Sequence, residues 1–224
     1  MKEAPLFEIV IPIYREVDLM DVAAPVEMFS WMAELWEARK AKVVLAAESL
    51  HPIRTRDGLT LTPDATFDDF RECGRQAQLI WVPGGNVSAL NRLMEGGSYL
   101  DFLVAQADRA DYVCSVCEGA MLLAAAGLLD GYCATTHWAF IPCFAAFPEI
   151  HVAEGFPRYV IDRNRVTGGG ISSGLDEALA VVALLAGDDI AKSVQMTTQY
   201  FPEPPFSQTI VPATACPLDL GGAN

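Results

Sequence analysis

Short apolar runs alternate with amphipathic stretches along the chain. An uninterrupted apolar run of this kind is typical of a strand that is buried on both faces of a sheet. The sequence predicts four such strands, at residues 7–14, 42–47, 78–82 and 111–116. Apolar residues at helical spacing predict helices at residues 22–37, 99–110, 121–126, 172–186 and 188–196. Because strands and helices alternate, we expect an α/β fold with a mainly parallel central sheet that is covered on both faces.

Turn residues mark two hairpins between these elements. Asp57–Gly58 is the predicted turn of a small hairpin over residues 53–62. Arg163–Asn164 is the predicted turn of a second hairpin over residues 159–167. Both hairpins are additions to the alternating strands and helices of the main sheet.

Prolines indicate where one helix begins and where an extended C-terminal segment lies. Pro25 fits the first turn of the helix at residues 22–37. Five further prolines lie after Phe201, and they predict an extended segment on the surface. No repeat or linker divides the chain. We therefore expect a single domain over residues 1–224, with residues 200–224 as its extended C-terminal tail.

The composition excludes several classes of protein. The chain has 224 residues, of which 52% are hydrophobic, and its 15 Lys and Arg against 29 Asp and Glu give a net charge of −14. So apolar a chain is not disordered, and its acidity argues against nucleic acid, because phosphate binding needs a basic patch. No stretch approaches the ~18 apolar residues of a membrane span, and residues 1–5 do not begin a signal sequence. We expect a cytoplasmic protein with reduced cysteines and no nucleic-acid or membrane partner.

Six cysteines are scattered along the chain, and one stands at a distinctive place. They are Cys73, Cys114, Cys117, Cys133, Cys143 and Cys216. We expect no disulfide framework, and five of the six to be structural or incidental. Cys117 directly follows a predicted strand and precedes Gly119 and a predicted helix. Such a turn holds a side chain in a strained conformation above the sheet, and the helix N-terminus favours an exposed thiolate. Cys117 is the candidate nucleophile; the alternative is one more buried cysteine.

The spacing of Cys114 and Cys117 also matches redox pairs and metal sites. Cys114 lies within the predicted strand, however, and is expected to point into the core. A zinc site would need a second pair of ligands, which the three histidines do not supply at ligand spacing. We therefore favour neither chemistry and expect no metal.

Three acidic residues are expected near the thiol. Asp18 and Asp21 follow the first strand at its carboxyl end, and Glu118 is the neighbour of Cys117. A carboxylate in this place can move protons to or from a thiol or a water molecule. Alternatively, Asp21 caps the following helix and Asp18 is a solvated loop residue. Glu118 would raise the pKa of the thiol when ionised, and would donate a hydrogen bond to a thiolate when protonated.

Two glycine-rich turns follow other strands. Pro83, Gly84 and Gly85 end the strand at residues 78–82, and glycines allow backbone N–H groups to face a cleft, as an oxyanion hole requires. The alternative is an ordinary tight turn. Residues 168–174 look like a phosphate cradle but lack the Lys of a P-loop. We interpret them as a turn that brings backbone close to the site.

Together these segments resemble the ThiJ/PfpI superfamily, which shares a flavodoxin-like three-layer sandwich with class I glutamine amidotransferases. The resemblance covers residues 7–206, and within the superfamily it is greatest to the isocyanide hydratases. The segments that carry it are Met20–Pro25, Val82–Gly85, Ser115–Ala120, Ala124–Gly131, Ala134–Trp138, Thr167–Ile171, Leu175–Asp176 and Pro202–Phe206. Each is weak alone, but their order and spacing are specific to the superfamily.

The resemblance implies a mechanism that needs no metal or organic cofactor. Cys117 would be the nucleophile and Asp21, in preference to Asp18, its acidic partner. The residues expected to form the anion pocket and bind substrate are Gly84, Gly85, Glu118, Gly169 and Asp176. The thiolate would attack the terminal carbon of an isocyanide, and water would then hydrolyse the thioimidate to an N-substituted formamide. A covalent step of this kind divides one difficult hydration into two easier ones.

The chain departs from the family pattern directly after the nucleophile. Isocyanide hydratases have a Thr at this position and the peptidase-like branch has a His, whereas this chain has Glu118. An adjacent Cys–His pair is therefore excluded, and Glu118 changes the charge at the sulfur. His137 either orients the site or satisfies its own hydrogen bonds at a strand end, and we favour the second interpretation.

Two other functions stay open within the superfamily. One is glyoxalase-like or deglycase-like chemistry on small carbonyl compounds, and the other is a redox or stress sensor whose Cys117 is oxidised to sulfinate. The transcription regulators of the superfamily carry a helix-turn-helix module, which the sequence after Met196 does not resemble. Superfamily members usually form homodimers with the active site near the interface. We therefore expect a small-molecule substrate and a homodimer.

Overall fold

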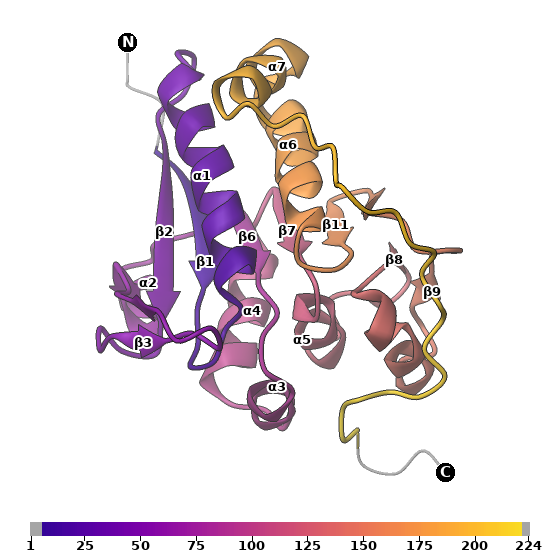
Figure 1. Ribbon diagram of the computed structural model, residues 1–224. Helices are drawn as coiled ribbons and strands as arrows, with labels where there is room; N and C mark the ends of the chain where they lie inside the picture. Colours follow the sequence, from indigo (N-terminus) through magenta and orange to yellow (C-terminus); the bar gives the residue numbers. More distant parts are fainter. Residues whose placement is uncertain (1–5, 221–224) are drawn as a thin grey trace.

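A twisted sheet runs through the centre of the molecule (Figure 1). The computed structural model describes residues 6–220, and the sheet order is β10-β11-β7-β6-β1-β2-β5. The strands are β1 (Phe7–Pro12), β2 (Ala41–Ala47), β5 (Ala65–Thr66), β6 (Leu79–Val82), β7 (Tyr112–Ser115), β10 (Tyr159–Asp162) and β11 (Arg165–Gly168). Neighbouring strands are parallel, except for the antiparallel pair β10 and β11. This confirms the predicted α/β fold with a mainly parallel sheet.

Helices cover both faces of the sheet and complete the three-layer sandwich (Figure 1). One face carries α1 (Leu19–Leu35), α6 (Ser173–Ala186) and α7 (Asp188–Thr197). The other carries α3 (Val87–Met94), α4 (Ser98–Ala107) and α5 (Gly119–Ala125), with the short α2 (Phe67–Glu72) packed against α4. A 3-10 helix, η1 (Trp138–Ala146), follows β8 (Cys133–Ala134), which pairs with β9 (His151–Val152). Helices α2, α3 and η1 were not predicted.

Neither end of the chain belongs to the described structure. Two segments lie outside the described residues. One is residues 1–5, from which we predicted the absence of a signal sequence. The other is residues 221–224, the last part of the predicted tail. From Leu6 to Leu220, no helix combines the length and the hydrophobicity needed to cross a bilayer.

Both predicted hairpins are present. β3 (Ile53–Arg54) pairs with β4 (Thr60–Leu61), and β10 pairs with β11. The first hairpin is fastened to the loop after β1, because Glu16 N–H donates to Arg54 O at 2.9 Å. The hairpin therefore lies at the carboxyl edge of the sheet.

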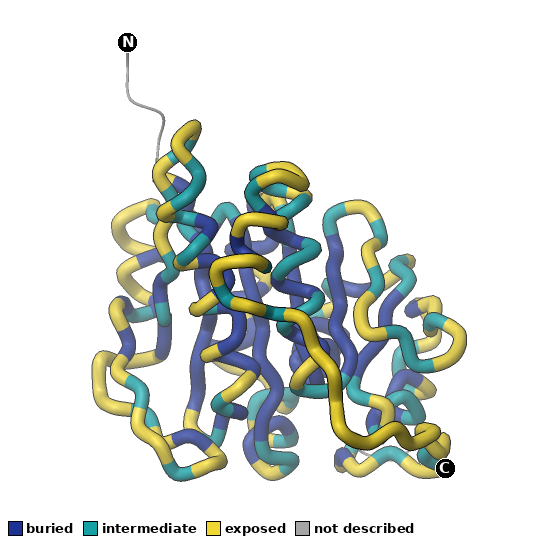
Figure 2. Tube along the Cα trace, turned by 45° about the horizontal axis from the view of Figure 1, so that its top comes forward, coloured by how far each residue is buried: buried dark blue, intermediate teal, exposed yellow. Residues whose placement is uncertain are grey.

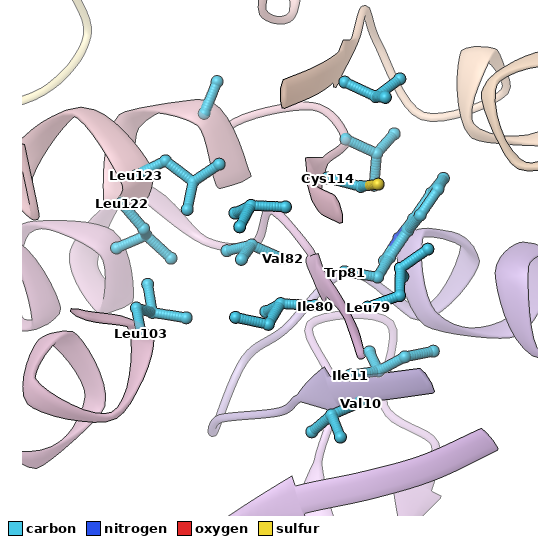
Figure 3. Packing of buried hydrophobic residues seen from close by; sticks show 14 of the residues in the cluster. Val10, Ile11, Leu79, Ile80, Trp81, Val82, Leu103, Cys114, Leu122 and Leu123 are labelled. Atoms are coloured by element: carbon cyan, nitrogen blue, oxygen red, sulfur yellow. The ribbon is translucent and has the colours of Figure 1, made fainter. Parts of the chain in front are cut away.

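The core is built on both faces of β6 (Figure 3). Successive side chains of a strand point to opposite faces, and here Leu79 and Trp81 point to one face while Ile80 and Val82 point to the other. The Trp81 ring lies edge-on to Phe29 of α1, with the ring centroids 5.6 Å apart. All four strand residues are fully buried. This explains why β6 is an unbroken apolar run in the sequence.

A hydrogen bond from Trp81 joins the start of α1 to the sheet, and Pro25 makes this bond possible. The helix begins earlier than predicted, because the Asp18 side chain caps it by accepting Met20 N–H at 3.2 Å. Pro25 consequently lies inside α1 rather than in its first turn. Proline has no N–H, so the Asp21 carbonyl four residues earlier loses its helical partner. The Trp81 indole donates to that carbonyl at 3.0 Å instead.

A disulfide fastens the segment that follows α7. Residues 201–220 have no helix or strand and are mostly exposed on the surface (Figure 2). Cys216 of this segment is bonded to Cys143 of η1. The prediction that all cysteines are reduced is therefore wrong for this pair. The partners are 73 residues apart in the sequence, so the bond joins this segment to the region between β8 and β9.

Replacing Cys216 by Ser should lower the thermal midpoint of unfolding. By the loop-entropy relation, a crosslink that closes a loop of this length contributes roughly 4 kcal/mol. Cys73→Ser changes an exposed free cysteine and should leave the midpoint unchanged. Alkylation of the denatured, unreduced protein should modify the four free cysteines. Modification of all six would contradict the pairing.

Candidate active site

Cys117 occupies the strained turn that the sequence predicts between β7 and α5. Its φ is 55°, in the left-handed region that residues with a side chain rarely adopt. Gly119 makes the turn sterically feasible, because a Cβ at this position would collide with the Val82 carbonyl of β6. The turn is thereby pressed against the end of the neighbouring strand.

Three hydrogen bonds hold Cys117 in this conformation. Its N–H donates to Gly169 O at 2.9 Å, and its carbonyl accepts from Thr136 Oγ1 at 2.8 Å. The Ile171 N–H donates to the sulfur. Gly169 was expected to bind substrate, but its N–H donates to Arg158 O at 2.8 Å. Both backbone groups of Gly169 are thus engaged within the protein, the carbonyl by the Cys117 turn and the N–H by Arg158.

Asp21 lies in the first turn of α1 with its side chain completely buried. Its Oδ2 accepts the Gly84 N–H at 2.9 Å. Its Oδ1 has no hydrogen-bond partner within residues 6–220. Burial first, and then the charges of Asp18 and Glu118, raise the pKa of Asp21 well above its ordinary value. A proton on this carboxyl is therefore favoured.

Asp18 is the N-cap of α1, a role that the sequence analysis gave to Asp21 as an alternative. Asp18 caps α1, so the interpretation of Asp21 as the helix cap is wrong. Asp18 is only 2% exposed rather than solvated, and its Oδ2 lies 2.9 Å from the Arg56 guanidinium. Burial raises the pKa of Asp18, while the Arg56 charge opposes that rise.

Glu118 is brought against both Cys117 and Asp21. One ligand atom from each of these three residues lies within 4.8 Å of the other two. The Cys117 thiol hydrogen-bonds to the Glu118 carboxyl, and Oε2 of Glu118 has no partner in the described chain. Burial raises the pKa of Glu118, although its hydrogen bond with the thiol lowers it. We call these three residues the thiol–carboxyl cluster.

The thiol itself differs from expectation. The sequence predicts an exposed and stabilised thiolate, but Cys117 is 1% exposed and its pKa is raised well above the ordinary value. Burial is the largest cause, followed by the charges of Asp21 and Glu118. The Ile171 N–H lowers the pKa but does not outweigh these effects. The predicted exposure and thiolate stabilisation are therefore wrong, because the local turn does not determine what covers the sulfur.

Gly84 and Gly85 end β6 beside the cluster, as predicted, but with unequal roles. The Gly84 N–H is occupied by Asp21, so it positions that carboxyl. Gly85 and Val17 are opposite each other in an isolated antiparallel β-bridge. The two hydrogen bonds of this bridge are made by the flanking residues, so the N–H of Gly85 takes no part in it. A Cβ at Gly85 would lie 2.6 Å from Glu16 O, so a side chain is excluded there.

Two other candidate residues lie in different surroundings. Asp176 of α6 accepts a hydrogen bond from Tyr200 at 2.9 Å and forms an ion pair with Arg158, so the structure does not place it in the thiol–carboxyl cluster. His137 caps η1, since its Nδ1 accepts the Ala139 N–H at 3.2 Å. Burial and the Arg56 charge lower the pKa of His137.

Sequence reasoning missed Arg56 and Tyr14. The Arg56 charge acts on Asp18, Asp21 and Glu118, which makes it a cation beside three acids. The buried Tyr14 hydroxyl donates to Pro83 O at 3.1 Å. Neither residue had a local signal, because one lies in a hairpin and the other ends an apolar run.

Comparison with known proteins places the chain in a family. A model of the DJ-1/PfpI family matches residues 8–184. The chain belongs to the DJ-1/PfpI family. It is 38% identical to isonitrile hydratase from Pseudomonas putida over 194 aligned residues. The aligned region covers 87% of this chain and 78% of that protein. The superfamily resemblance and the flavodoxin-like fold predicted from the sequence are thereby confirmed.

Two further relatives show the range of this DJ-1/PfpI family. A solved ThiJ/PfpI family protein from Pseudomonas syringae has 36% identity and a TM-score of 0.79, over 90% of this chain and 78% of that one. The HTH-type transcriptional regulator GbdR from Pseudomonas aeruginosa is 34% identical over 140 residues, which is 62% of this chain and 35% of the regulator. Family membership alone therefore does not define the reaction.

The thiol–carboxyl cluster is also the one set of His, Cys, Asp and Glu side chains within residues 6–220 that is close enough to share a metal ion. Metal ligands must be deprotonated. The pKa values of all three groups are raised, which opposes the deprotonation that metal binding would require.

Glu177 of α6 is a further buried acid beneath this site. It is completely buried, and neither carboxyl oxygen has a partner in the described part of the chain. Gly168 makes room for it, because a Cβ there would collide with the carboxyl group. Burial, followed by the Asp21 charge, raises the pKa of Glu177 well above its ordinary value. Folding therefore favours the protonated form.

Glu177→Gln should change how stability depends on pH. A carboxyl whose pKa is raised by folding stabilises fully below its unfolded pKa, and this contribution is lost as pH rises through the folded pKa. Glutamine does not titrate, so the unfolding free energy of the variant relative to the original protein should increase with pH. Urea unfolding at a series of pH values measures this difference.

The exposed Glu34 provides the matched control. Glu34→Gln makes the same change in charge and should show no such gain with pH. If the Glu177→Gln profile instead ran parallel to that of the original protein, the raised pKa of Glu177 would be refuted.

Proposed function

We propose that the protein is a cysteine-dependent hydratase that converts an isocyanide to an N-substituted formamide. The observation that carries the proposal is the thiol–carboxyl cluster, whose three reactive atoms lie within 4.8 Å of one another in a buried site. The 38% identity to isonitrile hydratase from Pseudomonas putida supports the choice of substrate.

An isocyanide suits a site that retains its protons. The molecule is neutral, and its terminal carbon accepts both a nucleophile and a proton. As Cys117 sulfur bonds to that carbon, the thiol proton leaves through a carboxyl group and is delivered to the same carbon. The product is a thioimidate, R–N=CH–S–Cys117, and no net charge is created. We assign this proton transfer to Asp21, since its Oδ2 is fixed by Gly84 and its Oδ1 has no partner within residues 6–220.

Hydrolysis of the thioimidate restores the thiol. The oxygen of a water molecule bonds to the carbon, and one of its protons passes through the carboxyl groups to the nitrogen. The C–S bond then breaks, the remaining hydroxyl proton passes to the sulfur, and the carbonyl forms. One isocyanide and one water have become one N-substituted formamide.

The peroxide-sensor alternative is less well supported by the site. Oxidation of a cysteine follows its thiolate character and its exposure. Cys117 is buried and its pKa is raised, so both properties are unfavourable. Carbonyl chemistry at the same sulfur stays an alternative that an assay can separate.

Formamide production from p-nitrophenyl isocyanide tests the proposal. Cys117→Ala removes the nucleophile and should lower kcat/KM by about 10³-fold or more. Asp21→Asn removes the proton carrier and should lower it by about 10²-fold or more. Cys73→Ser, at an exposed cysteine outside the cluster, should leave the rate unchanged.

Methylglyoxal is assayed in parallel. Absence of formamide from the original protein, or an unchanged rate in Cys117→Ala, would overturn the hydratase assignment. Consumption of methylglyoxal alone would favour the carbonyl alternative.

A further inference from the structure

A cavity lies at the carboxyl edge of the sheet, beyond the ends of β1 and β2. Its volume is about 610 Å³, which is within the usual range for small-molecule sites. The loops after β1 and β2, the hairpin strand β3, and helices α3 and α4 supply its walls. These elements gather at one end of the molecule (Figure 1). Open α/β sheets bind ligands at this edge.

Aromatic rings form a rigid apolar wall of the cavity. Tyr14, Phe67 and Tyr99 are all buried and line it. The Tyr99 ring lies edge-on to Tyr14 at 5.3 Å and to Phe67 at 5.8 Å between centroids. Tyr99 donates its hydroxyl to Pro12 O at 3.0 Å, and the Tyr14 hydroxyl is likewise bonded to backbone. Because both hydroxyls are engaged, this wall of the cavity is apolar.

Three arginines also line this cavity. Arg15, Arg54 and Arg92 line it, in a chain whose net charge is −14. Arg92 pairs with Glu16 at 3.2 Å. Arg15 and Arg54 are exposed, and neither has a carboxylate within ion-pair distance among residues 6–220. Two guanidinium groups are thus left for an anion from solution.

The start of α4 adds a positive end to the same cavity. Its N-cap is Gly97, which has no side chain to satisfy the first N–H groups of this ten-residue helix. A Cβ at Gly97 would meet nothing within 4 Å, so the approach is open. Glu48, the one acid among the described lining residues, hydrogen-bonds to Ser98 at the helix start. The charge balance of the lining is therefore positive.

We propose that this cavity binds a small organic anion, namely a carboxylate on an aromatic or aliphatic body. The carboxylate pairs with Arg15 and Arg54, whose planar guanidinium groups match its two oxygens. The apolar body lies on the rings of Phe67 and Tyr99. The cavity is distinct from the thiol–carboxyl cluster, because Tyr14 stands between them: its ring lines the cavity, while its hydroxyl bonds to Pro83 O beside Gly84.

Calorimetric titration with hydrocinnamate and its neutral amide, hydrocinnamamide, tests the proposal. Hydrocinnamate should bind saturably, and about tenfold or more tightly than the amide, because only the acid forms charge-assisted bonds. The Arg15→Gln, Arg54→Gln double variant should lose about the same factor for the acid. The exposed pair Arg71→Gln, Arg109→Gln lies outside the cavity and makes the same charge change, so its affinity should equal that of the original protein. Thermal midpoints check that all variants are folded.

Cys117→Ala locates the site with respect to the cluster. It should bind hydrocinnamate as tightly as the original protein does. Loss of binding in Cys117→Ala would place the anion at the sulfur and overturn the proposal. Equal affinity for acid and amide, unchanged affinity in the Arg15, Arg54 variant, or no saturable binding at millimolar concentrations would overturn it as well.

Discussion

Burial of two carboxyl groups beside the Cys117 sulfur is the constraint on which the rest of the site depends. Charges without water or counter-ions are costly, and buried groups of this kind shift their pKa values and become neutral. Asp21, Cys117 and Glu118 all have raised pKa values for this reason, with burial as the first cause in each. Under the proposed function, the cluster moves protons as bonds form, because burial disfavours a ready thiolate. A neutral substrate whose carbon takes up a proton fits this requirement.

The surrounding fold buries the cluster and fixes the positions of its residues. Pro25 frees the Asp21 carbonyl, and Trp81 of β6 takes it. Gly84 fixes the Asp21 carboxyl, and Gly169 fixes the backbone of the turn at Cys117. These contacts come from α1, β6 and the loops after β6 and β11, which the strand order brings together at the carboxyl edge. The position of Asp21 relative to the sulfur is thus a property of the tertiary fold, whereas Glu118 is the sequence neighbour of Cys117.

The sequence predicted what local geometry determines and missed what tertiary contacts determine. The strained turn at Cys117 follows from a strand, small residues and an immediate helix, all within ten residues. Its sulfur also contacts a residue far along the chain, because the Ile171 N–H donates to it. Arg56 likewise reaches the cluster only through the docking of a hairpin onto the loop after β1. The Cys143–Cys216 bond depends on the path of the C-terminal segment, which no spacing rule predicts.

Whether Cys117 holds its proton at neutral pH can be measured directly. Thiolate absorbance in the ultraviolet, taken as the difference between the original protein and Cys117→Ala across a pH series, reports this one sulfur. We predict no thiolate signal at neutral pH and a midpoint well above the ordinary range of a cysteine. In Glu118→Gln the midpoint should fall, because a like charge and an accepting carboxylate are both removed. A thiolate signal already present at neutral pH, or a midpoint that does not fall in Glu118→Gln, would contradict a proton-retaining cluster.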